Sequence, residues 1–300
     1  MPAFTCNVCG AFNQAGDFAT EPASCACGSN VRTRALIHLL SMELFGRCLA
    51  LPEFPVLKAL RGIGISDKDS YARPLAERFD YTNTHYDRDP RLDITEQHPQ
   101  LAGTLDFVTC SDVLEHVPPP VGRALEEIAG VLAPDGFLVG TVFCNSENRL
   151  REHFPELHQF RVINLGATRV LVNRRVDGSL EITGDLIVHG GDGLTLEMRE
   201  FGVSELEKHL LAAGFREIHF LADDVPERGI QFDNDVSQPF VARKCPFTMN
   251  RAATGQIIDG LRAARLEAEQ GALLQEKVRM ASQSRWLKLG RVLGLGPDFQ

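Results

Sequence analysis

The chain has 300 residues, of which 44% are hydrophobic and 24% charged, and its formal net charge is −9. This composition is typical of a globular protein with one large domain and a smaller module. Duplex nucleic acid needs a basic binding face, so the negative charge argues against nucleic acid as a partner. The sequence has no apolar run long enough to cross a bilayer and does not begin with a secretory signal, which predicts a cytoplasmic location.

Four of the eight cysteines lie in the first 27 residues, in the segments CNVCG and CACGS. Each pair is followed by a glycine, which suits a turn whose backbone N–H groups point at thiolate sulfur. A reducing compartment disfavours disulfides. The pattern therefore predicts a structural zinc knuckle over residues 1–30, with Cys6, Cys9, Cys25 and Cys27 as ligands. The alternative is a leader segment with four free thiols.

Strand and helix patterns alternate after the cysteines. In chain order they are a helix at 31–46, a strand at 59–66, a helix at 71–79, strands at 81–86 and 105–110, a helix at 121–133 and a strand at 136–143. A further helix and two closing strands follow before residue 245. Such alternation predicts an α/β fold, with a parallel sheet and helices on both of its faces.

Residues 61–67 read RGIGISD, and their G-x-G is the beginning of a nucleotide-binding loop. A dinucleotide loop would have a third glycine where Asp67 stands, and would be followed by an acid at a fixed spacing. An NAD-dependent oxidoreductase is therefore disfavoured. Read alone, the heptad fits equally well a strand that ends in a β-turn at Ser66 and Asp67.

Residues 105–142, LDFVTCSDVLEHVPPPVGRALEEIAGVLAPDGFLVGTV, resemble the second half of the nucleotide domain of class I S-adenosylmethionine-dependent methyltransferases. The resemblance covers most of residues 57–245 and implies a Rossmann-like, seven-stranded sheet. Asp135 departs from the family pattern, which has a glycine there. A narrower resemblance, carried by the cysteine knuckle and by residues 79–94 and 189–201, is to a bacterial group associated with surface-glycan assembly.

The resemblance implies that the chain binds S-adenosylmethionine, which has no phosphate and needs only a turn open to its methionine and ribose. Gly62 and Gly64 would let the backbone approach this cofactor closely. Ser66 and Asp67 would accept hydrogen bonds from its amino group or hydroxyls. Half of a glycine loop would then be sufficient.

Further cofactor residues are implied at the carboxyl ends of the next strands, where ligands of open α/β sheets bind. They are Asn83, Thr84 or Asp87 for the ribose, whose usual acid is missing, Asp93 and Ile94 for the adenine, and Ser111 and Asp112 after the fourth strand. Glu115 and His116 fit a helix start and packing equally well, and we expect His116 to be structural.

Residues from about 145 to 200 are an insertion relative to the methyltransferase fold, in which the next helix would follow directly. We call this insertion the lid and expect it to cover the methyl end of the cofactor. Within it, residues 169–182 read as a β-hairpin that turns at Asp177 and Gly178. The segment 189–193, HGGDG, would let the backbone approach a substrate. The alternative for that segment is a flexible loop with an exposed histidine.

The acceptor implied by the resemblance is a small molecule or a glycan hydroxyl, whose proton must leave as the methyl group arrives. Histidine suits the role of base at neutral pH. Three of the nine histidines lie on the predicted lid, namely His153, His158 and His189. We expect His189 to be the base, with Asp192 orienting its ring and His153 in the same site. A non-catalytic scaffold in a glycan-assembly complex is the alternative function.

Residues 251–300 form a basic tail after the methyltransferase domain, which is expected over 31–250. The tail has eight Lys/Arg against five Asp/Glu, and its helical pattern keeps no strict heptad, so a long coiled coil is not expected. Five basic residues between Lys277 and Arg291, together with Trp286, suit an anionic inner-membrane surface or the groove of a partner protein. A solvated helix is the alternative.

Overall fold

The structure is a computed structural model of the chain. It describes residues 3–14, 25–166, 168–189, 195–232, 237–246 and 251–283. The chain divides into two compact units, one formed by residues 1–44 and 48–248 and the other by residues 45–47 and 249–300.

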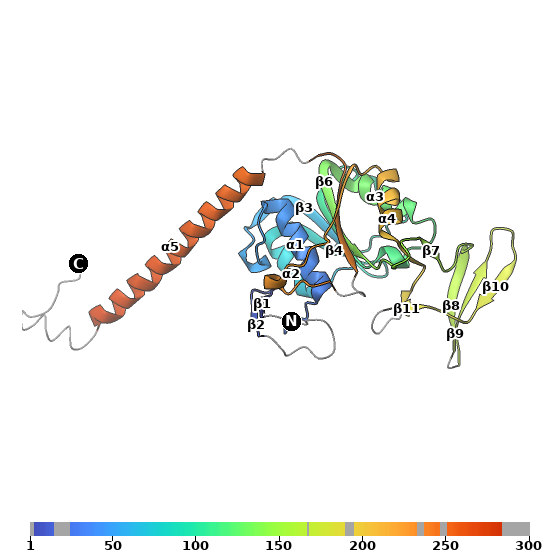
Figure 1. Ribbon diagram of the computed structural model, residues 1–300, viewed down its shortest axis with the longest axis horizontal. Helices are drawn as coiled ribbons and strands as arrows, with labels where there is room; N and C mark the ends of the chain where they lie inside the picture. Colours follow the sequence, from blue (N-terminus) through green and yellow to red (C-terminus); the bar gives the residue numbers. More distant parts are fainter. Residues whose placement is uncertain are drawn as a thin grey trace, which may run out of the picture. The chain divides into compact units, whose positions relative to one another are not determined.

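The larger unit is built on a six-stranded sheet with the order β14-β15-β6-β5-β3-β4 (Figure 1). Its parallel strands are β3 (Leu57–Ile65), β4 (Phe79–Thr84), β5 (Leu105–Ser111) and β6 (Leu132–Val142). Two antiparallel strands, β15 (Gln238–Arg243) and β14 (Glu217–Phe220), extend the sheet beyond β6. The strand order reverses between β3 and β5, which is where open α/β sheets bind their ligands.

Helices cover both faces of this sheet. Figure 1 shows α1 (Val31–Phe45) and α2 (Asp69–Arg78) on one face, and α3 (Gly122–Val131) and α4 (Val203–Ala212) on the other. Apolar side chains of α3 and α4 share one continuous core with β3, β5 and β6. The predicted Rossmann-like architecture is confirmed.

The prediction of a seventh strand in the main sheet is wrong for the part of the chain that the structure describes. Residues 85–104, between β4 and β5, form only a bridge between His85 and Arg91 and a short 3-10 helix, η2 (Pro99–Leu101). Prolines interrupt this segment and cannot donate the hydrogen bonds of a strand. A cavity of about 240 Å³ lies here, lined by residues of β3, β4 and the segment 91–101.

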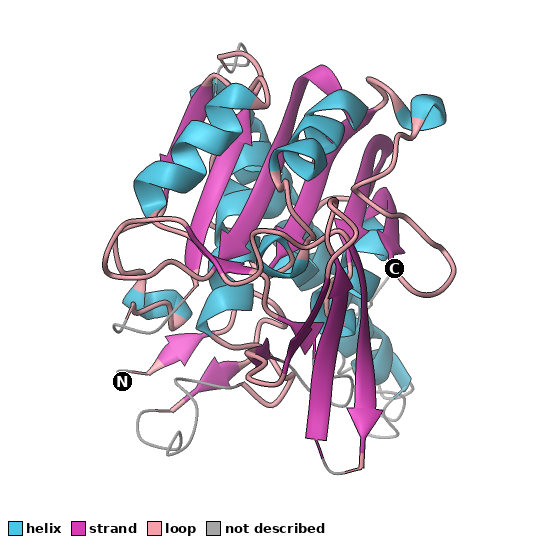
Figure 2. Cartoon of the chain, turned by 90° about the vertical axis from the view of Figure 1, so that its right-hand side faces the viewer, coloured by secondary structure: helices cyan, strands magenta, loops and turns pink. Residues whose placement is uncertain are grey.

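The lid between β6 and α4 consists of small antiparallel sheets. The largest contains β8 (Gln159–Leu165), β9 (Thr168–Arg174) and β10 (Leu180–Thr183), whose long strands are seen in Figure 2. The predicted hairpin is confirmed, because β9 pairs with β10 and Gly178 has a φ of 87°. The sequence analysis does not predict β8. Two shorter pairs are β7 (Arg151–Glu152) with β13 (Arg199–Glu200), and β11 (Val188–His189) with β12 (Thr195–Leu196).

Three more 3-10 turns and one strand pair complete the larger unit, namely η1 (Leu51–Glu53), η3 (Leu114–His116), η4 (Pro226–Arg228), and β1 (Phe4–Thr5) with β2 (Phe12–Asn13). The second unit contains the helix α5 (Arg251–Gln283), on which four leucines are more than half exposed. Trp286 lies outside the described residues. None of the helices in the described ranges is long and apolar enough to cross a membrane.

Candidate active site and cysteine cluster

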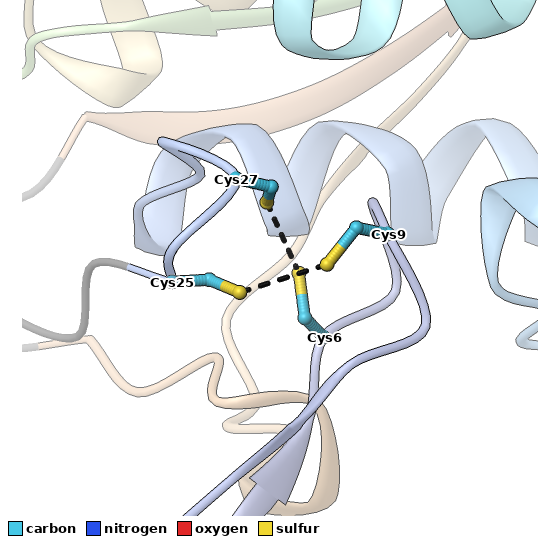
Figure 3. A group of neighbouring side chains, drawn as sticks. All are labelled: Cys6, Cys9, Cys25 and Cys27. Carbon is cyan, nitrogen blue, oxygen red and sulfur yellow. Dashed lines mark hydrogen bonds between the residues drawn. The ribbon is translucent and has the colours of Figure 1, made fainter.

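The four N-terminal cysteines come together in space from two segments of the chain (Figure 3). All four Sγ atoms lie within 4.8 Å of one another. The Sγ atoms of Cys6 and Cys27 are 3.8 Å apart, and those of Cys9 and Cys25 are 3.6 Å apart. None of the four forms a disulfide. Four sulfurs at these separations suit the tetrahedral coordination of zinc.

Each cysteine pair sits on a tight turn that ends in a glycine. The N–H of Gly10 donates to the carbonyl of Cys6, and the N–H of Gly28 to the carbonyl of Cys25, both over 2.8 Å. The two glycines have φ values of 79° and 81°, a left-handed conformation that other residues adopt at a cost. The glycines after both pairs are therefore required by the turns.

A fully buried arginine, Arg34 of α1, lies beside the thiols. Its guanidinium donates to the carbonyls of Gly229 and Ser29 and lies over the ring of Phe4, 4.8 Å from the centroid. Burial lowers the pKa of this guanidinium, whereas negative charge on the four cysteines would raise it. A buried cation is costly unless an anion compensates it. The position of Arg34 therefore acts in favour of thiolates, against the burial that raises the pKa of the Cys6 and Cys9 thiols.

Most of the predicted cofactor residues gather at the carboxyl ends of three adjacent parallel strands. Ser66 and Asp67 follow β3, Asn83 and Thr84 end β4, and Ser111 and Asp112 lie at the end of β5. Ser66 and Asp112 have left-handed backbones, with φ values of 56° and 50°. Since residues other than glycine seldom adopt this conformation, both chain reversals are held by the surrounding structure.

Asp67 is buried and accepts hydrogen bonds from three hydroxyl groups. Tyr71 donates to its Oδ1 over 2.7 Å, and Tyr81 and Thr109 both donate to its Oδ2 over 2.5 Å. Burial raises the pKa of the Asp67 carboxyl to about 6, although the three donors act in the opposite direction. The Asn83 amide also binds the Asp67 backbone through two hydrogen bonds, of 2.9 and 2.8 Å. Asp67 therefore fixes the turn after β3 from within.

The two glycines of β3 make room for aromatic rings. A Cβ on Gly62 would lie 2.3 Å from the ring of Phe107, and one on Gly64 would lie 2.0 Å from the hydroxyl oxygen of Tyr81. These two rings come from the strands on either side of Gly62, and their centroids are 6.0 Å apart. The sequence analysis explains both glycines by a close approach to the cofactor. The structure places them inside β3 and shows that packing requires them.

Two of the three alternatives for the ribose are engaged within the protein. Asn83 binds the Asp67 backbone, and the hydroxyl of Thr84 donates to the carbonyl of Gly64 over 2.8 Å. Asp87 is exposed, three residues beyond the end of β4.

Asp93 and Ile94 lie in the segment after β4, and both are buried. The Oδ1 of Asp93 accepts hydrogen bonds from the backbone N–H and the hydroxyl of Thr95, over 2.9 and 2.7 Å. Its Oδ2 is 3.6 Å from the guanidinium of Arg91, which is half exposed. Ile94 belongs to the core under β3 and α3. One carboxylate oxygen of Asp93 therefore holds its own loop, while the other lies near the half-exposed guanidinium of Arg91.

Asp112 is held by three parts of the chain that are distant in sequence. Arg32 of α1 forms an ion pair with its Oδ2, and the hydroxyl of Ser237 donates to the same oxygen over 2.9 Å. Thr141 of β6 donates to its Oδ1 over 2.8 Å and lies 2.9 Å from the hydroxyl of Ser111. The sequence analysis does not identify Arg32, because a helical pattern carries no sign of a contact with a residue 80 positions away.

The segment Leu114–His116 joins the sheet to the lid. The Oε1 of Glu115 accepts a hydrogen bond from the N–H of Phe143 over 2.9 Å, and its Oε2 has no hydrogen-bond partner among the described residues. Burial raises the pKa of this carboxyl to about 7, although the bond from Phe143 acts against it. The Nδ1 of His116 lies 3.0 Å from the carbonyl of Leu196. These contacts fit a packing role for both residues.

His153 and Glu197 form a buried pair at the base of the lid. The Nε2 of His153 is 2.9 Å from the Oε1 of Glu197, whose side chain is 3% exposed. The N–H of His153 donates to the carbonyl of Met198, and the N–H of Met198 donates to the carbonyl of Glu115, over 2.8 and 2.7 Å. This chain of bonds links the pair to Glu115 in η3, the turn that follows β5. Of these two residues only His153 is predicted from the sequence, because Glu197 has no recognisable spacing from it.

Glu200 extends this pair into an ion-pair network. Its Oε1 is 4.0 Å from the Nε2 of His153, and its Oε2 is 3.5 Å from the guanidinium of Arg151. The ligand atoms of His153, Glu197 and Glu200 lie within 4.8 Å of one another, a separation that a metal ion could bridge. Each carboxylate already has a basic partner, so the network is explained without a metal.

The two residues chosen from the sequence as base and orienting acid fall at the border of the described structure. The backbone of His189 pairs with that of Thr195 between β11 and β12. Its side chain lies outside the described residues, and so does the whole of Asp192. The N–H of Glu197 donates to the carbonyl of Ile187 over 2.9 Å. The strand that carries His189 therefore runs beside the segment that leads to Glu197.

Comparison with known proteins gives a domain match. Residues 61–171 match the family described as a methyltransferase domain. The search of curated proteins found no match. Among solved structures, a 1,6-didemethyltoxoflavin-N1-methyltransferase of Burkholderia thailandensis with bound S-adenosylhomocysteine has 18% identity and a TM-score of 0.38, covering 71% of this chain and 78% of its own.

Two more solved structures are similar to a comparable degree. An amino pentose methyltransferase of Micromonospora echinaspora, with bound S-adenosylmethionine, has 14% identity and a TM-score of 0.40 over 72% of this chain and 92% of its own. A methyltransferase of Mesorhizobium loti has 15% identity and a TM-score of 0.39, with coverage of 65% and 95%. These scores are low, so the assignment rests on the domain match and the sheet.

The matched segment begins in β3 and runs through the parallel strands to β9 of the lid, so it contains the whole carboxyl edge described above. Fold and match together define a class I methyltransferase domain. Residues 61–171 are therefore those of a methyltransferase domain, and the sheet that carries them has the class I methyltransferase fold.

Proposed function

We propose that the chain is an S-adenosylmethionine-dependent methyltransferase that methylates a hydroxyl group of a small polar acceptor, and that a saccharide or glycan is the acceptor class. The observation that carries the proposal is the pair of His153 and Glu197, because a hydroxyl acceptor needs a base and this pair supplies one that backbone hydrogen bonds link to the turn after β5. The saccharide class rests on the sequence resemblance alone.

The carboxyl edge would hold the cofactor with two kinds of group. Ser66, Asp93, Ile94, Ser111 and Asp112 are the residues we propose to contact it. Asp67, Asn83, Thr84, Gly62 and Gly64 would act indirectly, because their polar atoms or their missing side chains serve the packing of β3 and β4. Asp87 is the acid that we propose for the ribose diol, since the other two alternatives are engaged within the protein.

Bound S-adenosylmethionine supplies an electrophilic methyl group. The task of the chain is then to hold the acceptor oxygen in line with that group, to exclude water and to take up the proton. In neutral His153 the contact with Glu197 assigns the ring proton to Nε2, so Nδ1 is the atom that accepts the proton. His189 with Asp192 is the competing assignment for the base, and variants of each histidine separate the two.

We further propose that the cysteine cluster binds one zinc ion. The donor set fits, because four sulfurs lie within 4.8 Å of one another on two glycine turns. Four thiolates around Zn²⁺ carry a net charge of −2, which would compensate the buried guanidinium of Arg34. Among the described residues, the charged groups that act on Arg34 are the four cysteines, and neutral thiols would leave its charge uncompensated there.

Isothermal titration calorimetry with S-adenosylhomocysteine tests the cofactor assignment. We expect binding in the micromolar range, about −8 kcal/mol, and no heat with NAD. Asp93→Ala should weaken binding by roughly 1–3 kcal/mol, because it removes a hydrogen bond to the adenine and frees the loop that Asp93 holds. Glu126→Ala, at an exposed position of α3, is the matched control. No heat with either nucleoside would instead support the scaffold function.

A further inference from the structure

We propose that the cysteine cluster and the cofactor site are energetically coupled through Arg32, so that metal on the thiols raises the affinity for the cofactor. Arg32 is in this view a positioning residue, which acts on the cofactor through Asp112. The inference rests on the proposed zinc and cofactor sites but goes beyond them, because both sites could exist without influencing each other.

The covalent path between the two sites is short and rigid. Only four residues separate Cys27 from Arg32. Within this link, the carbonyl of Ser29 accepts a hydrogen bond from the N–H of Cys25 over 2.9 Å, and the hydroxyl of Ser29 lies 3.1 Å from the Sγ of Cys6. Ser29 is completely buried. The residues that lead into α1 are therefore part of the cysteine cluster.

The first turn of α1 is fixed by the same link. Asn30 caps the helix, because its Oδ1 accepts a hydrogen bond from the N–H of Thr33 over 3.0 Å and its own N–H donates to the Thr33 hydroxyl over 2.9 Å. One turn on, Arg34 binds the carbonyl of Ser29 and, across the fold, the carbonyl of Gly229. The direction in which Arg32 leaves the helix is set by these contacts.

Arg32 connects the first turn of α1 to the carboxyl edge of the sheet. It pairs with the Oδ2 of Asp112, whose left-handed backbone ends the central strand β5. Asp112 in turn shares Thr141 with Ser111, so Arg32 bears on both residues that we propose as cofactor contacts after β5. If the cluster loses its metal, the link 28–31 loses its anchor, and Arg32 is no longer held against Asp112.

Coupling between two binding sites is reciprocal, so the cofactor must raise the affinity for zinc by the same factor. Couplings between two binding sites are commonly about 5- to 150-fold. We expect an effect near the lower end, about 5- to 10-fold, because Arg32 and Asp112 are about one-quarter and one-fifth exposed and water screens their interaction.

The test measures S-adenosylhomocysteine affinity by calorimetry on the full chain, with zinc bound and after removal by a chelator, in the wild type and in Arg32→Ala. Zinc removal should weaken binding about 5- to 10-fold in the wild type. Arg32→Ala should show that weaker binding already with zinc present, and zinc removal should change it no further. Arg32→Lys should recover part of the difference. Arg73→Ala, which removes an exposed arginine of α2, should behave as the wild type.

Because the metal-free chain can unfold, the reciprocal measurement is made on folded protein. Zinc affinity is determined by competition with a chromophoric chelator, with and without S-adenosylhomocysteine. The nucleoside should tighten zinc binding in the wild type and not in Arg32→Ala. Equal zinc affinity with and without nucleoside in the wild type overturns the coupling while leaving both sites in place. A chain that binds no S-adenosylhomocysteine at all overturns the proposed cofactor site together with the coupling.

Discussion

The carboxyl edge of the main sheet and the lid use their polar side chains in opposite ways. At the edge, Asp67, Asn83, Thr84 and Asp112 are each bound by other protein groups. In the lid, the sheet of β8 to β10 exposes apolar side chains on the face that Ile163, Leu165, Leu180 and Ile182 share. Its histidine–carboxylate pair lies at the junction with the main sheet, whereas the hairpin itself has only the exposed ion pairs of Arg175 with Glu156 and Glu181 among its described residues.

This difference assigns the ordering of the binding surface to the carboxyl edge and the proposed proton transfer to the lid junction. The hydrogen bonds at the edge stabilise two left-handed backbone turns, so the binding surface is already ordered before a ligand arrives. The lid junction holds the one described histidine that is paired with a buried acid at this end of the sheet. Changes at the edge and the cysteine cluster should therefore alter stability and binding, whereas changes at the lid junction should alter turnover.

The largest expected effect is the loss of the zinc site in Cys6→Ser/Cys9→Ser. Metal analysis should find about one zinc per wild-type chain and none in the variant. Because Arg34 would lose its compensating charge, we expect the chain to be destabilised by about 3–5 kcal/mol. This corresponds to a fall of roughly 6–20 °C in the melting temperature for a unit of this size.

Cys245→Ser is the control for that experiment, since this cysteine lies outside the cluster and contacts the carbonyl of Pro134. It should keep the metal. Zinc-free wild-type protein that melts at the same temperature as the zinc-bound form would contradict the structural role of the cluster.

At the lid junction, His153→Ala should lower turnover by about 10²–10⁴, the range typical of a lost general base. The affinity for S-adenosylhomocysteine should not change, because His153 contacts the lid segment and not the carboxyl edge. Glu197→Gln should have a smaller effect of the same kind, since it weakens the orientation of the ring. Single-turnover kinetics with an identified acceptor measures both variants.

His219→Ala, on an exposed position of β14, is the matched control and should leave turnover as in the wild type. If His153→Ala keeps wild-type turnover and His189→Ala loses it, His189 is the base, as predicted from the sequence. The pair of His153 and Glu197 then has no part in proton transfer.

Much of the fold could be predicted because its signals are local. The leucine spacing of α1, the Asp177-Gly178 turn and the glycines of the cysteine turns each express a short-range physical constraint. Contacts between distant segments left no such signal. Arg32 meets Asp112 across 80 positions and His153 meets Glu197 across 44, and nothing in either helix or strand pattern marks these partners.

The seventh strand was expected from resemblance, and the local sequence already argued against it. Pro90 and Pro99 interrupt the segment between β4 and β5, and they remove backbone donors that a strand would use. In the same way, the G-x-G of β3 resembles a loop signal in the sequence. Its glycines instead make room for the rings of Phe107 and Tyr81, and this packing has no local sequence signal.

A smaller effect, of about 3 kcal/mol at most, is expected in the pH dependence of stability at Glu115. Its folded pKa is raised to about 7 from an ordinary value near 4.5 by burial. The carboxyl therefore contributes stability that is fully present below about pH 4.5 and is lost as the pH rises toward 7. Glu115→Gln keeps the acceptor for the N–H of Phe143 but cannot titrate.

Urea unfolding from pH 4.5 to 8 should show that this variant loses less stability than the wild type as the pH rises. Glu126→Gln, on the exposed face of α3, should follow the wild type throughout. Parallel curves for the wild type and Glu115→Gln would show that the raised pKa contributes nothing to folding.

The smallest expected effect concerns Gly64 of β3, which makes room for the Tyr81 hydroxyl and the Asp67 carboxylate. Gly64→Ala would place its Cβ 2.0 Å from the Tyr81 hydroxyl oxygen and 2.4 Å from Asp67, so the hydrogen bonds of Asp67 must shift. Overpacking of this kind costs about 1–3 kcal/mol. Gly130→Ala, in α3 with nothing within 4 Å of its Cβ, should instead be neutral or stabilise by about 0.5–1 kcal/mol. Urea unfolding compares the two variants, and calorimetry with S-adenosylhomocysteine should show weaker binding for Gly64→Ala alone. If Gly64→Ala kept full stability but lost cofactor binding, the glycine would be a direct contact, as the sequence first suggested, and the edge would not be shaped from within.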